Sequence, residues 1–205
     1  EETRVSLVPD SVAKLLSQNN EVIIETGAGE QATFSDKLYL DAGATVAKSF
    51  EELIAKSDIV LKIHPPNIDK RLGRMEIDLL KNGSCLIGLL QPLSNTDLIE
   101  TLRSKNITSF SLDAIPRIAR AQSMDVLSSM SSLAGYKSAI MAANTLEKYF
   151  PMMMTAAGTY APAKGLVLGA GVAGLQAIAT CKRLGAVMQA FDVRPVVKEQ
   201  VESVG

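Results

Sequence analysis

Six residues between a short apolar segment and a predicted helix have the types and spacing of a phosphate-binding turn. The segment Gly169-Ala170-Gly171-Val172-Ala173-Gly174 follows a strand predicted over residues 164–168 and opens a helix predicted over residues 172–184. A second strand is predicted over residues 186–191, and Asp192 follows it directly. Glycines permit a tight turn, a close approach of pyrophosphate and close helix packing, while the helix N-terminus offers N–H groups. The order strand, turn, helix, strand, acid therefore predicts a dinucleotide-binding βαβ unit.

The acid after the second strand narrows the expected cofactor. A carboxylate at the position of Asp192 accepts hydrogen bonds from the 2′- and 3′-hydroxyls of an adenosine ribose and repels a 2′-phosphate. Arg194 weighs against this preference, because an arginine at that position is able to pair with a 2′-phosphate. The acid is better placed than the arginine, so the sequence favours NAD(H) over NADP(H).

Composition excludes several classes of protein. The 205 residues are 47% apolar, which is enough for a substantial core, and 21 basic residues nearly balance 22 acidic ones. The chain has no block of like charge that would predict a nucleic-acid partner, and it has no apolar run of the roughly 18 residues that a membrane span needs. Cys85 and Cys181 are expected to be buried thiols in a reducing compartment. No metal site is predicted.

The first part of the chain alternates strands and helices, which predicts an open, mostly parallel, doubly wound sheet. The expected strands cover residues 4–8, 21–25, 45–48, 58–63, 84–90 and 107–112, and the expected helices cover residues 9–18, 34–42, 50–56, 75–80 and 95–105.

The second half of the chain begins with a long apolar helical pattern. We expect two Rossmann-like α/β domains, with the first over residues 1–127, a linking helix over 128–150 and the start of the second over 151–205. Two strands alone would leave an apolar face bare, so the second domain is expected to be truncated, with its other strands outside this sequence. Met152-Met153-Met154 is expected to pack beneath the linker.

Several segments resemble one family. Glu2-Thr3-Arg4-Val5, Glu25-Thr26-Gly27-Ala28-Gly29 and Asp58-Ile59-Val60-Leu61-Lys62 are similar to the amino-terminal domain shared by alanine dehydrogenases and transhydrogenase alpha subunits. The stretch Pro116-Arg117-Ile118-Ala119-Arg120-Ala121-Gln122-Ser123-Met124-Asp125-Val126-Leu127-Ser128-Ser129, followed by Leu133-Ala134-Gly135-Tyr136, resembles the NAD(H)-binding component of proton-translocating transhydrogenases in particular.

The resemblance implies roles for individual residues. Arg117 and Asp125 would hold the nicotinamide carboxamide and the nearby ribose, Gln122 would reach towards the second nucleotide, and Ser128 would support the nicotinamide end. The complete set of cofactor-binding residues expected on this basis is Arg117, Ile118, Ala119, Gln122, Ser123, Met124, Asp125, Gly169, Gly171, Val172, Gly174, Asp192, Val193 and Arg194.

The resemblance also implies partners and a location. Hydride would pass directly between NAD(H) on this chain and NADP(H) on a partner domain, and a transmembrane proton-channel domain would couple the transfer to proton movement. Such a transfer needs alignment of two rings but no acid or base. A homodimer is implied, as is a soluble domain peripheral to a membrane, on the bacterial cytoplasmic or mitochondrial matrix side.

Two other functions stay open from the sequence. An alanine-dehydrogenase-like oxidoreductase would need an acid/base, usually histidine, and the only histidine is His64. In those dehydrogenases the histidine belongs to the segment matching Leu89-Leu90-Gln91-Pro92, so His64 is expected to be a strand-end residue facing solvent or the neighbouring proline. Arg4 and Lys62 match substrate-carboxylate contacts of the dehydrogenases. A non-catalytic NAD(H)-binding module is the third possibility.

Overall fold

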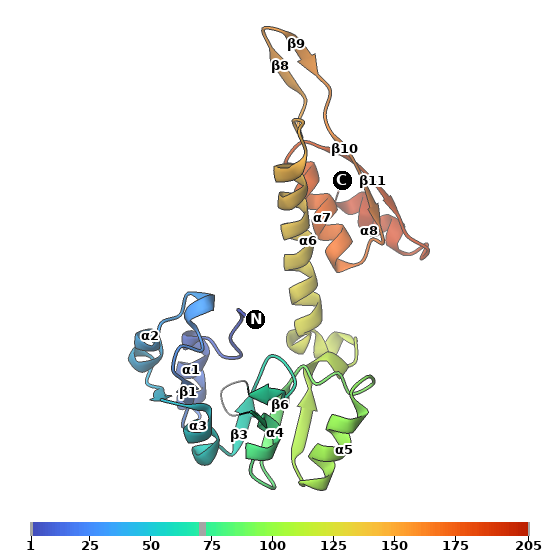
Figure 1. The fold of residues 1–205 in the computed structure, drawn as a ribbon. Coiled ribbons are helices and arrows are strands. Elements are labelled where there is room, and N and C mark those ends of the chain that lie inside the picture. Colours follow the sequence, from blue (N-terminus) through green and yellow to red (C-terminus); the bar gives the residue numbers. More distant parts are fainter. Residues whose placement is uncertain (1, 70–72, 205) are drawn as a thin grey trace. The chain divides into compact units, whose positions relative to one another are not determined.

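The computed structural model describes residues 2–69 and 73–204, which belong to two compact units, Glu1–Met124 and Asp125–Gly205 (Figure 1). The long helix that the sequence assigns to a linker lies within the second unit. The boundaries of the sequence-based division therefore stay a prediction, and each unit is described separately below.

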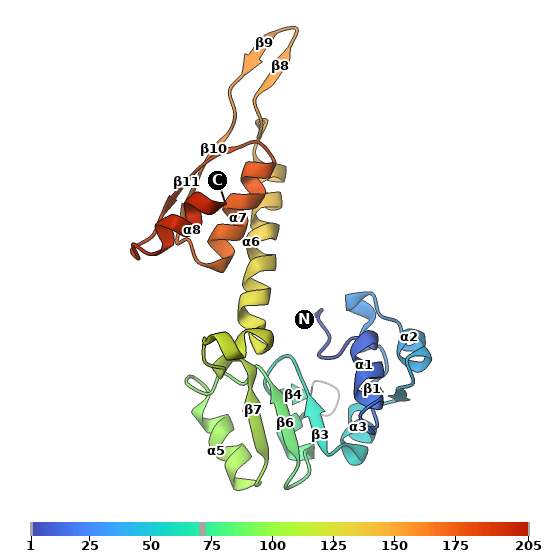
Figure 2. The same ribbon diagram turned by 180° about the vertical axis from the view of Figure 1, so that it is seen from behind.

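The main sheet of the first unit is parallel. Its strands β3 (Ile59–Leu61), β6 (Cys85–Gly88) and β7 (Thr108–Ser111) have the order β3-β6-β7, and they lie side by side in Figure 2. In the register, Ile59 and Thr108 both pair with Cys85, so the carboxyl ends of the three strands share one edge. Helices α3 (Phe50–Lys56), α4 (Glu76–Leu79) and α5 (Thr96–Ser104) contribute side chains to the core of this sheet.

A second parallel pair completes the first unit. Strands β1 (Ile23–Glu25) and β2 (Thr45–Ala47) pair with each other, and helices α1 (Pro9–Leu16) and α2 (Asp36–Asp41) are their neighbours in sequence. Their core centres on Val12 and Tyr39, both fully buried. The described remainder comprises the antiparallel pair β4 (Ile68–Asp69) and β5 (Arg74–Met75) and the 3-10 helices η1 (Glu30–Ala32), η2 (Leu112–Ala114) and η3 (Ala119–Met124).

The second unit contains the βαβ arrangement expected from the sequence. Strands β10 (Lys164–Leu168) and β11 (Val187–Phe191) are parallel and joined by helix α7 (Val172–Arg183), and α8 (Val197–Ser203) follows. Helix α6 (Val126–Thr145) lies along α7 in both views (Figures 1 and 2). The antiparallel hairpin of β8 (Met153–Thr155) and β9 (Gly158–Tyr160) projects beyond the end of α6.

The α/β class, the parallel strands and the long helix are confirmed, whereas two local predictions are wrong. Residues 4–8 form no strand, although Val5 and Leu7 pack against the Val12 and Tyr39 core and the Tyr39 hydroxyl donates to the Leu7 carbonyl at 2.8 Å. The apolar alternation there reflects packing without a strand partner. The Met-rich segment does not pack beneath a linker either, since it forms part of the hairpin, and Met154 is 78% exposed.

The two cysteines do not form a disulfide. Cys181 is buried and Cys85 is half-buried, and both are unpaired thiols. Burial raises the pKa of each thiol, which disfavours the reactive thiolate. Among residues 2–69 and 73–204, none of the helices has the length and apolar character needed to cross a bilayer, and no group of three or more His, Cys, Asp or Glu side chains could hold a metal ion.

Candidate functional site

The glycine turn joins the end of β10 to the start of α7. Gly169 has a φ of +91°, a left-handed conformation that favours glycine, and its N–H donates to the Phe191 carbonyl at 2.8 Å. A Cβ placed on Gly174 would collide with the carbonyl oxygen of Gly169, so only glycine lets the helix approach the turn this closely. Around Gly171, by contrast, nothing lies within 4 Å of an added Cβ. The space above the turn is therefore open at the position where a phosphate group would approach a helix N-terminus.

The carboxylate of Asp192 is fastened to that turn. Its Oδ2 accepts from the Ala170 N–H at 2.8 Å, which connects the end of β11 to the loop after β10. Its Oδ1 accepts from the Arg194 backbone N–H at 2.9 Å, and the Arg194 guanidinium donates to both oxygens at 3.1 Å. Hydrogen bonds from Arg194 are the main reason that the pKa of Asp192 lies well below its usual range. The group is therefore an ionised acceptor at neutral pH.

Arg194 is engaged by this carboxylate. A guanidinium forked onto Asp192 is not positioned to act as an independent binding group for a 2′-phosphate, and its pKa is raised because the carboxylate accepts its hydrogen bonds. The Arg194 side chain remains 57% exposed, so a phosphate would have to draw it away from its partner. The pairing of Arg194 with Asp192 thus weakens the objection that Arg194 raises against an NAD(H) preference.

A pocket of about 400 Å³ lies beside the same carboxylate. Ala170 and Asp192 line one side of it, while Val197 and Val201, one turn apart on α8, contribute apolar surface. This volume is within the range of small-molecule sites. Helix α8 and the part that it contributes to the pocket were not predicted from the sequence, although the apolar spacing of Val197 and Val201 could have indicated a helix.

Asp125 and Ser128 are brought together at the start of α6. Asp125 is the N-cap of this helix: its carboxylate accepts from the Ser128 N–H at 2.9 Å and from the Ser128 hydroxyl at 2.6 Å. This cap explains why α6 begins at Val126, two residues before the predicted start. Further along, a Cβ on Gly135 would collide with the Ala173 carbonyl, so α6 packs closely against the first turn of α7. Both Asp125 and Ser128 therefore belong to the unit that carries the glycine turn.

The other predicted nicotinamide residues lie in the first unit. They precede or occupy η3, which is anchored by the buried Ala121. Arg117, Ile118, Ala119, Gln122, Ser123 and Met124 are all exposed. The structure thus presents these side chains to solvent, where a ligand or a partner protein could reach them.

The residues that match a dehydrogenase substrate site are already paired within the chain. The Arg4 guanidinium donates to both carboxylate oxygens of Glu2 at 2.9 and 2.8 Å, and the His64 Nε2 lies 2.6 Å from Glu2 Oε2. The hydrogen bonds from Arg4 lower the pKa of Glu2 to about 2. Lys62 Nζ donates to both oxygens of Glu76 at 2.9 Å. The His64 side chain is 58% exposed, as expected for a strand-end residue facing solvent.

Comparison with protein families matches nearly the whole chain. Residues 1–134 match the model of "Alanine dehydrogenase/PNT, N-terminal domain", and residues 138–205 match "Alanine dehydrogenase/PNT, C-terminal domain". Among curated proteins, the chain is 48% identical over 204 residues to an NAD(P) transhydrogenase subunit alpha polypeptide of Rhodospirillum rubrum, covering 100% of this chain and 53% of that protein. It is 29% identical over 195 residues to alanine dehydrogenase of Mycolicibacterium smegmatis, covering 94% and 50%.

Solved structures give the same two relationships. The chain superposes on the transhydrogenase from Sinorhizobium meliloti with a TM-score of 0.91 at 45% identity, covering 100% of this chain and 59% of the other. An L-alanine dehydrogenase gives a TM-score of 0.80 at 28% identity, covering 99% and 55%. The chain spans about half the length of the R. rubrum relative that it matches.

Proposed function

Because the chain belongs to the alanine dehydrogenase/PNT family, we propose that it is the NAD(H)-binding part of an NAD(P)+ transhydrogenase alpha subunit. This oxidoreductase would transfer hydride directly between NAD(H) on this chain and NADP(H) on a partner domain, coupled to proton translocation. The observation that carries the proposal is the Asp192 carboxylate, ionised and hydrogen-bonded to the glycine turn through the Ala170 N–H. Relatives named as transhydrogenase alpha subunits, at 48% and 46% identity, give the proposal its reaction.

The glycine turn and the end of β11 would hold the pyrophosphate and adenosine of NAD(H). Gly169 and Gly171 leave open space before α7, which begins at Val172, and Gly174 lets the helix pack closely on the turn, so the helix N-terminus suits an anionic pyrophosphate. Asp192, with its neighbours Val193 and Arg194, would meet the adenosine. The Asp192 carboxylate has about four acceptor directions, and its four present hydrogen bonds use them, so ribose hydroxyl groups would take the place of the Arg194 guanidinium. Its negative charge disfavours a 2′-phosphate in the same place.

The nicotinamide end would be aligned by residues on both sides of the start of α6. Arg117 and Asp125 would hold the carboxamide and nearby ribose, Ser128 would support Asp125 as it does in the cap, and Gln122 would reach towards the second nucleotide. Ile118, Ala119, Ser123 and Met124 would border the ring. NAD(H) supplies the hydride chemistry, so these side chains are needed for orientation and exclusion of water and not for proton transfer.

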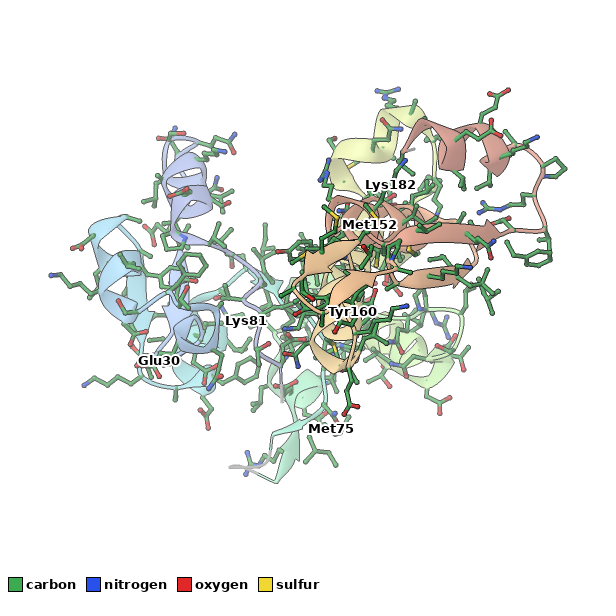
Figure 3. The ribbon with its side chains drawn as sticks, turned by 90° about the horizontal axis from the view of Figure 1, so that it is seen from above. Glu30, Met75, Lys81, Met152, Tyr160 and Lys182 are labelled. Carbon is green, nitrogen blue, oxygen red and sulfur yellow. The ribbon has the colours of Figure 1, made fainter. Side chains whose placement is uncertain are left out.

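The proposed partners are an NADP(H)-binding domain, a transmembrane proton-channel domain and a second copy of this chain. A peripheral position at the cytoplasmic or matrix side of the membrane would place the chain beside those domains. Residues 149–163 contain no charged side chain, and Met152 and Met154 are 61% and 78% exposed. Met152 and Tyr160 are labelled on this segment in Figure 3. An exposed uncharged segment of this kind supports a protein partner.

The alanine-dehydrogenase-like alternative is less well supported. It would require Arg4 and Lys62 to be available for a substrate carboxylate, yet Glu2 and Glu76 neutralise them. It would also require a histidine in the segment after β6, where the chain has Leu89-Leu90-Gln91-Pro92. A non-catalytic NAD(H)-binding module would share every feature of the cofactor site and would differ only in lacking hydride transfer.

Two measurements on the full-length protein that contains this chain test the proposal. Calorimetry with NADH and NADPH should give clearly tighter binding of NADH, and equal affinities would contradict the role of Asp192. Assays of NAD+ reduction with L-alanine should give no turnover, whereas NADH should reduce NADP+ when the NADP(H)-binding partner is added. Turnover of L-alanine would overturn the transhydrogenase proposal in favour of the dehydrogenase. Binding of NADH without transfer in the presence of a functional partner would support the non-catalytic module.

A further inference from the structure

A second aspartate joins two neighbouring strand ends, in the first unit. Asp113 lies in η2, just after β7, and accepts two backbone hydrogen bonds from the segment after β6. The Leu90 N–H donates to Oδ1 and the Gln91 N–H donates to Oδ2, both at 3.0 Å. The Ser111 hydroxyl donates to Oδ1 at 2.5 Å and accepts from the Leu90 N–H at 3.2 Å. One carboxylate therefore fixes the relative position of the loops after β6 and β7.

The loop after β6 depends on this carboxylate for its shape. Leu90 is fully buried and anchors the loop in the core, whereas Gln91 has a φ of +51°, a conformation unfavourable for a residue with a side chain. Gln91 then turns the chain, because its carbonyl accepts from the N–H groups of Ser94 and Asn95. Strained backbone persists when surrounding bonds over-determine it, and the bond to Asp113 is such a bond.

The loop after β7 leads directly into the proposed nicotinamide segment. Asp113 is separated from Arg117 by three residues, Ala114, Ile115 and Pro116. Pro116 restricts its own φ and the conformation of Ile115, and its carbonyl accepts from the Ile118 N–H at 2.9 Å. The path from the carboxylate to Arg117 is therefore short and stiff. We therefore expect a displacement of Asp113 to displace the backbone of Arg117 as well.

We propose that Asp113 is a positioning residue for hydride transfer: by fastening the loop after β6, it fixes the point from which the Arg117–Met124 segment leaves the sheet. This inference rests on the proposed function, because it assumes that Arg117 and Gln122 align the nicotinamide ring. Asp113 itself touches neither cofactor nor substrate. Its effect passes through the backbone of the segment that it holds.

The test compares Asp113→Asn with a matched control, Asp36→Asn. Asp36 makes a similar clamp in the same unit: it accepts from the Gly27 N–H at 2.9 Å and from the Thr26 hydroxyl at 2.6 Å, and it is not part of the proposed site. Each substitution replaces one acceptor oxygen by an NH2 group and should lower the melting temperature of the full-length protein. Hydride transfer from NADH to a thionicotinamide analogue of NADP+ is then measured with the partner component, well below both melting temperatures.

We expect Asp113→Asn to lower kcat about tenfold or more with little change in KM for NADH, since misplacement of aligning groups by about 1 Å is costly in rate. Asp36→Asn should leave kcat unchanged. Asp113→Glu, which retains the carboxylate, should recover part of the rate. Equal kcat values for Asp113→Asn and Asp36→Asn would overturn the positioning role. Arg117→Ala distinguishes the positioning role from the proposed function. If Arg117→Ala loses hydride transfer and Asp113→Asn does not, only the role of Asp113 is refuted. If Arg117→Ala retains hydride transfer, the proposed nicotinamide site is refuted.

Discussion

The two units each contain an aspartate that follows a parallel strand and binds the loop after the neighbouring strand. In the second unit Asp192 follows β11 and accepts from the Ala170 N–H, and in the first unit Asp113 follows β7 and accepts from the Leu90 and Gln91 N–H groups. The loops that they bind differ. Ala170 belongs to a glycine turn with open space above Gly171, whereas Leu90 is an anchored core residue. On the proposed function, the same type of hydrogen-bonded carboxylate would support ligand binding in the second unit and loop placement in the first.

The glycine turn should show the largest effect. Gly174→Ala places a methyl group against the Gly169 carbonyl, so it should destabilise the second unit by about 1–3 kcal/mol and abolish measurable NADH binding. Gly171→Ala is the matched control for stability, because nothing lies within 4 Å of its added Cβ. It should preserve the melting temperature yet weaken NADH binding, since the methyl group occupies the approach to the helix N-terminus. Denaturant unfolding and calorimetry distinguish the two; normal NADH binding by Gly171→Ala would argue against a phosphate at this turn.

Substitution of the clamp in the second unit should change cofactor choice. Asp192→Asn removes a charged acceptor and releases the Arg194 guanidinium, so NADH affinity should fall about 10- to 100-fold. NADPH affinity should fall less or rise, because the freed arginine can meet the 2′-phosphate. Calorimetric titrations with both nucleotides measure the ratio. An unchanged NADH to NADPH ratio would mean that this carboxylate does not contact the ribose.

Substitution of the clamp in the first unit should change stability without changing cofactor choice. Asp113→Asn replaces one of the two acceptor oxygens of the side chain by an NH2 group, which should cost about 1–2 kcal/mol of unfolding free energy. The NADH to NADPH affinity ratio should stay at the wild-type value. Denaturant unfolding and the same titrations check both expectations. A change in that ratio would show that Asp113, like Asp192, affects the choice of cofactor.

The smallest effect concerns the ion pair at the start of the chain. The pKa of Glu2 is lowered from 4.5 to about 2 by Arg4, so the folded state binds this proton less tightly than the unfolded state. Its contribution to stability is fully present above pH 4.5 and is lost as the pH falls through about 2. Because the pair is partly exposed, Glu2→Gln should cost no more than about 1 kcal/mol at about pH 6, and the difference from wild type should shrink at more acidic pH. Urea unfolding at about pH 6, 4 and 3 measures it, and a difference independent of pH would exclude the ion pair as its cause.

Local sequence signals predicted the elements well. The helix over residues 50–56 and the strand over residues 164–168 were predicted at the bounds that the structure has, because each is marked by its own neighbours along the chain. Residues 4–8 show the limit of such signals, since their apolar alternation is satisfied by packing against Tyr39 and not by a strand partner. The exposed hairpin of β8 and β9 was missed for a related reason: methionines predict burial, whereas this segment projects into solvent.

The two aspartates differ in how far the sequence could predict their hydrogen bonds. Asp192 was predicted because a glycine turn lies at a fixed distance before it in the sequence. The bonds of Asp113 to Leu90 and Gln91 cross from one strand end to another, over 23 and 22 residues, and no local pattern announces them. The engagement of Arg194 by Asp192 was likewise visible only in the structure, since residue types alone allowed the arginine to serve either the carboxylate or a phosphate.

The most direct test of the proposed function follows a labelled hydride. The full-length protein is mixed with its NADP(H)-binding partner, NADP+ and NADH carrying deuterium at the transferred position of C4, and the products are analysed by mass spectrometry. Direct transfer between two aligned rings predicts that the deuterium appears in NADPH without exchange into water, and that Arg117→Ala slows its appearance. Unlabelled NADPH, or no NADPH at all, would contradict the central claim that this chain binds NAD(H) so that its hydride passes directly to a second nicotinamide.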